Sequence, residues 1–261
     1  MPFQQAGPIR FFTFPALSAF PELFHAVLTR RGGSSPVPWA SLNLGGTVGD
    51  NPGFVLRNKH NALQAMQRNP DQVFDVWQVH GREMVRATGP RRKHETHQKA
   101  DIILTNQPRL TLLMRFADCV PILLYDPAHH AVGLAHAGWQ GTVKLVARAA
   151  VESMQAEFDT NPADIVAGIG PSIGPDHYQI GEDVAQQVQA AFGSEAAGLL
   201  HTSNGKASLD LWAANRLLLE QAGVKQIELA GICTACHMED WFSHRGENGR
   251  TGRFGVMIGL Q

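Results

Sequence analysis

Residues 116–142 read FADCVPILLYDPAHHAVGLAHAGWQGT and contain two apolar runs, Val120–Tyr125 and Ala131–Ala135, on either side of a polar segment. Runs of this length bounded by turn residues are typical of buried strands. Asp126-Pro127 followed by His129-His130 indicates an exposed hairpin turn between them. The stretch therefore predicts a strand, a turn and a second strand, followed by a helix after the glycines.

The same patterns predict the other elements of the chain. Short apolar runs indicate strands at Val73–Val79, Ile102–Thr105, Leu110–Arg115, Asp164–Ile169, Ile227–Cys233 and Gly255–Leu260. Apolar residues at three- and four-residue steps indicate helices at Pro52–Arg68, Thr142–Phe158, Glu182–Phe192 and Ser208–Ala222. Strands outnumber helices and do not alternate regularly with them. We therefore predict an α+β fold over residues 1–261, a single domain with a mixed β-sheet core flanked by helices.

The composition excludes several classes of protein. The chain has 261 residues, 22 Lys and Arg against 23 Asp and Glu, and a net charge of −1, which argues against a general nucleic-acid binder. An apolar run long enough to span a membrane and a signal peptide are both missing from the sequence, so we expect a cytoplasmic protein, and we favour a monomer. Three Cys cannot form a disulfide framework, which leaves the surplus of 12 His to be explained.

Three potential ligands lie at the edges of predicted strands, namely His80, Cys119 and His136. Two imidazoles and a thiolate suit Zn²⁺, and three protein ligands leave a fourth position open for water. The alternative is a small buried thiol beside two hydrogen-bonded histidines. Spacing alone favours that alternative, because 39 and 17 residues separate the three positions.

Other segments suggest further sites. The glycines before Thr142 place the start of a helix beside the proposed metal, which predicts an anion site on its first amides or, equally, a simple turn. Gly168–Gly174 is expected to be a rigid loop lining a pocket, and the charge run Arg91–His97 to be a solvated loop. Cys233-Thr-Ala-Cys236-His237 matches a c-type haem attachment motif, but the absence of export signals argues against haem. A zinc half-site or a redox pair remains a minor alternative there.

Nine stretches of the chain, taken together, resemble the laccase-domain family, also called multicopper polyphenol oxidase proteins and treated largely as purine nucleoside phosphorylases. They are LTRRGGSS (28–35), ASLNLGGTVGDNP (40–52), WQVHG (77–81), ADIILT (100–105), ADCVPILLYD (117–126), AHAGWQGT (135–142), GIGPSIGP (168–175), ICT (232–234) and GRTGRFG (249–255). Each is modest alone, but they extend over nearly the whole chain in the family's order.

The resemblance implies a metal site of His80, Cys119 and His136, holding Zn²⁺, or Cu²⁺ in some members. It implies phosphorolysis of adenosine, inosine, guanosine and methylthioadenosine, deamination of adenosine, and editing of peptidoglycan precursors in bacterial relatives. We assign catalysis to Cys119, His136 and Asp118, the last as a proton-shuttling carboxylate. The residues expected to bind the nucleoside and phosphate lie in the matching stretches: Asn43, Gln78, Gln140 and Arg253.

The chain departs from the family pattern at positions that matter for phosphate. Gln140 stands where the family usually has Arg, His244-Arg245-Gly246 replaces Tyr-Arg-Arg, and Gln179 replaces Glu. Arg245, Arg250 or Arg253 is our hypothesis for the compensating cation.

Three rival functions are kept open. They are a copper-dependent polyphenol oxidase, a metal-free hydrolase using Cys119 and His136, and a non-enzymatic binding module. The copper oxidase is disfavoured because no two His are two positions apart, as a trinuclear copper cluster would require.

Overall fold

The computed structural model describes residues 2–92, 94–203 and 205–261. Two six-stranded sheets form the body of this described part. The first sheet runs in the order β1 (Phe3–Ala6), β2 (Ile9–Phe12), β3 (Leu23–Leu28), β15 (Phe254–Leu260), β7 (Thr111–Phe116) and β4 (Val73–Asp75). The second runs in the order β14 (Gln226–Leu229), β10 (Val166–Ile169), β8 (Val120–Asp126), β9 (Ala131–Ala137), β6 (Ile102–Thr105) and β5 (Met84–Arg86). Both sheets mix parallel and antiparallel pairs, which confirms the predicted mixed sheet flanked by helices.

Alternation along the strands distributes side chains among three apolar clusters. On β8, Leu123 and Tyr125 enter the core between the two sheets, while Ile122 and Leu124 face the helices. On β15, Val256 and Ile258 enter the inter-sheet core, and Met257 faces the opposite side. Successive side chains of a strand point to opposite faces, so each sheet contributes to two clusters. The result is a layered arrangement of helix, sheet, sheet and helix.

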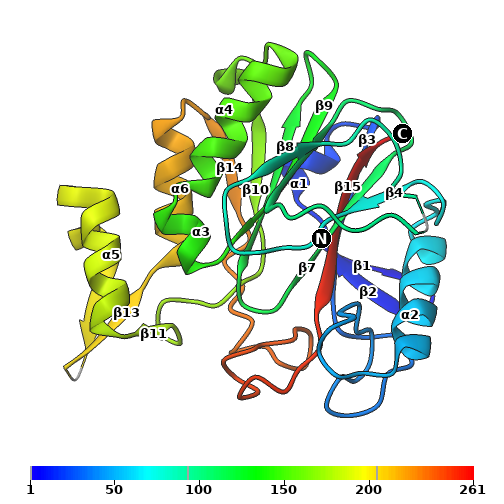
Figure 1. Cartoon of the computed structure of the whole chain (residues 1–261), viewed down its shortest axis with the longest axis horizontal. Helices are drawn as coiled ribbons and strands as arrows, with labels where there is room; N and C mark the ends of the chain where they lie inside the picture. Colours follow the sequence, from blue (N-terminus) through cyan, green and yellow to red (C-terminus); the bar gives the residue numbers. More distant parts are fainter. Residues whose placement is uncertain (1, 93, 204) are drawn as a thin grey trace.

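Helices cover the outer face of each sheet (Figure 1). The second sheet is covered by α3 (Trp139–Val143), α4 (Val146–Phe158) and α6 (Leu211–Gln221), while α2 (Pro52–Ala65) lies against the first. The remaining helices are α1 (Pro15–Ser18), α5 (Glu182–Phe192) and the 3-10 turns η1 (Pro162–Asp164) and η2 (Gly193–Gly198). A small sheet of β11 (Gln179–Ile180), β13 (Lys206–Leu209) and β12 (Leu200–Ser203) stands with α5 at one edge of the molecule (Figure 1). Within the described residues, we find no helix that is both long enough and apolar enough to cross a membrane.

The hairpin predicted from residues 120–135 is confirmed. Strands β8 and β9 pair antiparallel from Val120↔Ala137 to Asp126↔Ala131, and the turn that contains His129 and His130 is exposed. Buried Asp126 accepts the amides of Ala128 and His129 and so closes the turn. Because this hairpin lies at the centre of the second sheet, it positions the residues at its open end, where Val120 pairs with Ala137.

Several predicted boundaries are wrong, each for a local reason. The helix expected at Thr142–Phe158 is broken, because Leu145 adopts a left-handed conformation (φ 63°) between α3 and α4. The helix expected from Ser208 begins at Leu211, since the Asp210 side chain caps it by accepting the Ala213 amide. The strand expected to reach residue 79 is β4, which ends at Asp75. The strand expected to reach residue 233 is β14, which ends at Leu229. No strand before residue 30 is predicted from the sequence, yet β1, β2 and β3 lie there.

Candidate functional site

His80, Cys119 and His136 come together, as predicted. Their ligand atoms all lie within 4.8 Å of one another. The antiparallel register of β8 and β9 pairs Pro121 with His136, so Cys119, two residues earlier, reaches the same end of the hairpin. His80 arrives from the segment after β4, and its ring centroid lies 4.9 Å from that of His136. Ligands that are far apart in the sequence are therefore brought together by strand pairing.

One buried carboxylate orients both histidines. Asp101 directly precedes β6. Its Oδ1 lies 2.7 Å from Nδ1 of His136 and accepts a hydrogen bond from the His80 backbone amide at 3.1 Å. Its Oδ2 accepts the amides of Gly81 at 2.6 Å and Val79 at 3.1 Å. These contacts hold His80 in its left-handed conformation (φ 58°). Since Nδ1 of His136 is bound to the carboxylate, Nε2 is the nitrogen free to bind a metal, an arrangement common among metal-ligating histidines.

Gly138 makes room for the donor set. A Cβ atom at this position would lie 2.8 Å from Sγ of Cys119 and 3.0 Å from Cδ2 of His80. The contact with Cys119 is shorter than Cβ atoms show and the contact with His80 is tight, so a residue without a side chain lets the backbone after β9 pass close to the donors.

Cys119 and His136 form a strongly coupled acid–base pair. Burial acts to raise the pKa of the Cys119 thiol, but the charge of His136 and hydrogen bonds to both histidines lower it to about 6. Burial acts to lower the pKa of His136, but the Cys119 thiolate and Asp101 raise it to about 9. Without a metal the site therefore holds a thiolate beside an imidazolium.

The donor set fits a borderline-soft divalent metal. Two imidazoles and a thiolate are typical ligands of Zn²⁺, and three protein ligands are typical of a zinc site that keeps one position open. The thiolate form of Cys119 and the carboxylate behind His136 supply the deprotonated ligand and the outer support that such a site requires. The residues present therefore suit the metal that the sequence predicts.

A cavity of about 680 Å³ opens over the donor set. Such a volume is typical of small-molecule sites. Aromatic side chains of Trp77, Trp139 and Tyr178 contribute to its lining, and the indole of Trp77 is 51% exposed. An exposed large aromatic ring beside a polar site is a surface on which a planar ligand can stack.

Positive charge lines another part of the cavity. Arg115, Arg245 and Arg253 lie there, and Arg115 is bound to Asp75 through Nη2 at 2.5 Å. Nη1 of Arg245 donates to the Gln179 carbonyl, and Nη1 of Arg253 to that of Gly252. Within the described residues, the Nε and Nη2 groups of Arg245 and Arg253 have no hydrogen-bond acceptor. These guanidinium groups can therefore donate to an anion in the cavity.

Three of the other predicted site residues line the cavity, and Asn43 does not. Asp118 lines the cavity, and its carboxylate accepts the Thr234 hydroxyl at 2.7 Å and the Arg245 amide at 2.6 Å. Gln78 also lines it, although its side-chain amide is bound at both ends to the backbone of Arg115. Gln140 lines the cavity as an exposed side chain.

Asn43 lies outside the cavity lining and is fully buried. Its Oδ1 accepts the amides of Gly45 and Arg253, both of which line the cavity, and its Nδ2 donates to Asp50 at 2.9 Å. Asn43 therefore supports the backbone of the cavity wall.

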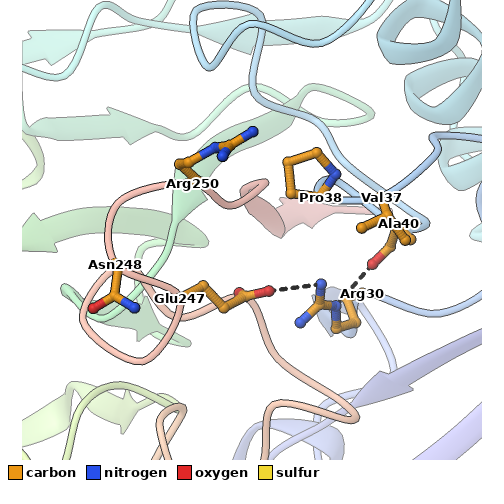
Figure 2. A pocket seen from close by; sticks show the side chains of 7 residues that line it. All are labelled: Arg30, Val37, Pro38, Ala40, Glu247, Asn248 and Arg250. Atoms are coloured by element: carbon orange, nitrogen blue, oxygen red, sulfur yellow. Dashed lines mark hydrogen bonds and ion pairs between the residues drawn. The ribbon is translucent and has the colours of Figure 1, made fainter.

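The three candidate compensating arginines are also divided. Arg245 and Arg253 line the cavity, whereas Arg250 belongs to another surface hollow (Figure 2). In that hollow, Arg30 bridges the Glu247 carboxylate and the Ala40 carbonyl. Arg245 and Arg253 therefore lie beside the donor set, and Arg250 does not.

Three expectations about connecting segments change. The helix begins at Trp139, so the Thr142 amide is bound to the Gly138 carbonyl at 2.8 Å inside α3 and is not one of its first amides; the anion site on those first amides stays a prediction. The charge run is only partly solvated, because Arg91 and His97 bind buried Asp75; Lys93 lies outside the described residues. The loop that contains Gly168–Gly174 does not line the cavity, although Tyr178 after it does.

Asp101, Arg115, Trp77 and Tyr178 are not among the site residues predicted from the sequence. Asp101 and Trp77 stand inside family stretches, and the position of a lone carboxylate directly before an apolar strand is a signal for Asp101. Arg115 ends a predicted strand with no motif around it. Its role depends on the pairing of β7 with β4, which brings it to Asp75.

Comparisons with known proteins agree on one group of relatives. Residues 24–261 match the family described as multi-copper polyphenol oxidoreductase laccase. A purine nucleoside phosphorylase of Bacteroides thetaiotaomicron is 35% identical over 95% of this chain and 96% of its own length. The purine nucleoside phosphorylase YlmD of Bacillus subtilis is 34% identical over 92% and 89%. The crystal structure of YlmD from Geobacillus stearothermophilus superposes with a TM-score of 0.92 at 33% identity, covering 100% and 99% of the two chains.

Proposed function

The chain belongs to the multi-copper polyphenol oxidoreductase laccase family, and from that premise we propose that it is a zinc-dependent purine nucleoside phosphorylase with adenosine deaminase activity. The proposed substrates are adenosine, inosine, guanosine and methylthioadenosine. One observation carries the proposal: a single cavity combines a His–Cys–His donor set, aromatic rings and free guanidinium donors. Relatives named purine nucleoside phosphorylase, 34–38% identical to this chain, support it.

Phosphate binds, in this proposal, to the guanidinium groups of Arg245 and Arg253. The N–H groups that have no acceptor among the described residues can donate charge-assisted hydrogen bonds to the phosphate. Such bonds are about twice as strong as hydrogen bonds between neutral groups. Asp118 accepts the backbone amide of Arg245 and so fixes the segment that carries this cation. The purine stacks on the aromatic lining that includes Trp77 and Tyr178.

In phosphorolysis a phosphate oxygen forms a bond to C1′ of the ribose while the bond from C1′ to the purine nitrogen breaks. The electron pair of that bond goes to the purine, which leaves with a proton on its ring nitrogen. His244 lines the cavity and is the imidazole that we assign to this proton, because His97 is bound to Asp75 and burial lowers the pKa of His97. In deamination Asp118 is the carboxylate that we assign to proton transfer.

His80, Cys119 and His136 would hold the zinc ion, with Asp101 orienting two of them. When bound, zinc supplies Lewis acidity beside the reacting atoms. A cytoplasmic location and a monomeric state stay predictions.

A second candidate is the hydrolase in which Cys119 acts as a nucleophile and His136 as its base, with peptidoglycan precursors as substrates. The lowered pKa of the Cys119 thiol favours it, because a thiolate at neutral pH is the reactive form. A copper polyphenol oxidase is disfavoured by the number of histidines. Among the described residues, one His/Cys group contains two His and the other contains one, whereas a trinuclear copper cluster requires several His pairs.

The experiment measures purine and ribose 1-phosphate formation, together with bound zinc, in a set of variants. His80→Ala and Cys119→Ser should lose the zinc ion of this donor set, together with phosphorolysis and deamination. Asp101→Asn should weaken zinc binding or activity by about 10- to 100-fold, because it removes an outer-sphere partner. The control is His60→Ala, an exposed histidine on α2, which should behave as the parent protein.

Full nucleoside turnover in chelator would overturn the proposal. Turnover of an amino-acyl precursor in chelator, blocked by a thiol alkylator, would establish the hydrolase instead.

A further inference from the structure

A second group of sulfur and nitrogen donors lies outside the cavity lining. The ligand atoms of His177, Cys233 and Cys236 are all within 4.8 Å of one another. Nδ1 of His177 lies 3.5 Å from Sγ of Cys236 and 3.9 Å from Sγ of Cys233. Two thiols and an imidazole thus converge from segments that are 56 residues apart in the chain.

These separations match the edges of a zinc tetrahedron. With bonds of about 2.3 Å to sulfur and about 2.1 Å to nitrogen, a tetrahedral ion separates its ligand atoms by about 3.6 to 3.8 Å. The two nitrogen-to-sulfur distances bracket that value. A disulfide or a chance contact between side chains has no need of the imidazole in this position.

The backbone fixes the buried member of the group. Residues 172 and 233 form an isolated parallel bridge, and the Thr234 amide donates to the Ser172 carbonyl at 3.0 Å. The Gly174 amide donates to Sγ of Cys233 at 3.2 Å, a contact that stabilises a thiolate. A Cβ on Gly174 would lie 3.2 Å from Cβ of Cys233 and 3.2 Å from the Trp212 ring, so the glycine eases the close approach of this loop to Cys233. Cys233 is therefore held in place before any ligand arrives.

The remaining donors leave access for an ion. Cys236 and His177 are exposed, and Oδ2 of Asp176 lies 3.3 Å from Nδ1 of His177, which brings a carboxylate to the open side. His237, the residue that a haem attachment motif would use as a ligand, instead faces Glu239 at 3.2 Å. The two cysteines of the C-x-x-C-H sequence therefore lie beside a histidine from another loop, and His237 lies apart from them.

We propose that His177, Cys233 and Cys236 form a second zinc site, separate from the donor set of the cavity, with Asp176 or a water molecule in the fourth position. The metal joins the loop at residues 174–178 to the segment after β14. Tyr178 follows His177 and lines the cavity, and Arg245 packs over the Tyr178 ring at 5.2 Å. The second site is therefore a structural one that stabilises this wall of the cavity.

The test counts zinc in the whole protein, reconstituted under reducing, oxygen-free conditions. The parent protein should bind two zinc ions, Cys119→Ser and Cys236→Ser one each, and the double variant none. Since Cys236 is exposed, its substitution should leave the fold intact, and His177→Asn provides a second exposed variant with the same expected loss. His237→Ala is the matched control and should still bind two.

Cobalt substitution identifies which site is filled. Thiolate-to-cobalt absorption should be about twice as strong in Cys119→Ser, which keeps two thiolates, as in Cys236→Ser, which keeps one. Zinc binding that is unchanged by Cys236→Ser would overturn the proposal. So would a Cys119→Ser protein that binds no zinc, with or without a Cys233–Cys236 disulfide in its mass spectrum.

The two metal proposals fail in different ways. If the cavity donor set does not bind zinc, the parent protein and Cys119→Ser each bind one ion, and Cys236→Ser binds none.

Discussion

Gln140 is the residue at which this chain departs most directly from the family pattern, which usually has Arg there. Its exposed side chain lines the cavity. We expect Gln140→Arg to lower the KM for phosphate about three- to tenfold, because a guanidinium adds a charge-assisted hydrogen bond that solvent exposure weakens. Steady-state kinetics at saturating adenosine measure the effect.

Gln140→Ala is the control and should change the phosphate KM less than twofold, as a rough bound for an exposed neutral side chain. An unchanged phosphate KM in the arginine variant would show that phosphate binds elsewhere in the cavity.

Cys119 and His136 determine how zinc binding depends on pH. Between the Cys119 pKa of about 6 and the His136 pKa of about 9, the metal-free site keeps its proton on His136. Zinc must displace this proton, so zinc affinity should rise with pH from about 6 to about 9, with close to one proton released at about pH 7.5. Calorimetry in buffers of different ionisation enthalpy measures the release, in Cys236→Ser so that only the cavity site contributes. Zinc binding without proton release would contradict the prediction that the metal-free site holds a proton on His136 beside the Cys119 thiolate.

The three candidate metal donors could be identified from the sequence, but the carboxylate that supports them could not. His80, Cys119 and His136 stand in recognisable family stretches, whereas spacing alone favoured a structural reading. Asp101 has its role only because β6 pairs with β9 and brings the carboxylate beside His136. Such a contact depends on strand register, which no local pattern contains.

The boundary after α4 carries an exposed residue in an unfavourable conformation. Asp159 ends the helix in the left-handed region, with φ 56° and ψ 26°. Glycine has no Cβ to oppose this conformation and is preferred after helices. We expect Asp159→Gly to raise the free energy of unfolding by about 0.5 kcal/mol and Asp159→Ala to lower it by a similar amount. Denaturant titration followed by circular dichroism measures both, and a more stable alanine variant would contradict the argument.

The type of an element was predictable where apolar residues follow one another, as in β8 and β9, or recur at helical steps, as in α5. The break between α3 and α4 was not, because residues 142–158 keep helical periodicity through Leu145 and the break comes from the backbone at that residue. The N-terminal strands were missed because Pro8 and Pro15 interrupt their region and β3 contains buried His25. The pKa of His25 falls to about 4 on burial, and its Nε2 accepts the Phe14 amide, so a polar residue serves inside the core.

The two ends of the chain meet in one sheet. Strand β15, the last in the chain, pairs with β3 on one side and β7 on the other. We expect the protein to unfold as one domain in a single cooperative transition. We also expect deletion of residues 254–261 to prevent folding, because the deletion leaves β3 and β7 without their shared partner strand. Calorimetry and limited proteolysis measure this, with deletion of exposed Gln261 as the control. Two separate transitions would contradict a single domain.

The candidate site lies where strands and loops from both sheets meet. Cys119 and His136 come from the second sheet, and Arg115 and Arg253 lie at β7 and β15 of the first. The layered fold brings the candidate donor set and a cationic wall to one cavity, and the proposed function requires both to act on one substrate.

That claim is tested most directly by following adenosine cleavage in zinc-loaded and zinc-free protein, each with and without inorganic phosphate. We predict ribose 1-phosphate in an amount equal to the sum of adenine and hypoxanthine, only when zinc and phosphate are both present. Cleavage in the zinc-free protein, or adenine released with free ribose in the absence of phosphate, would contradict the account.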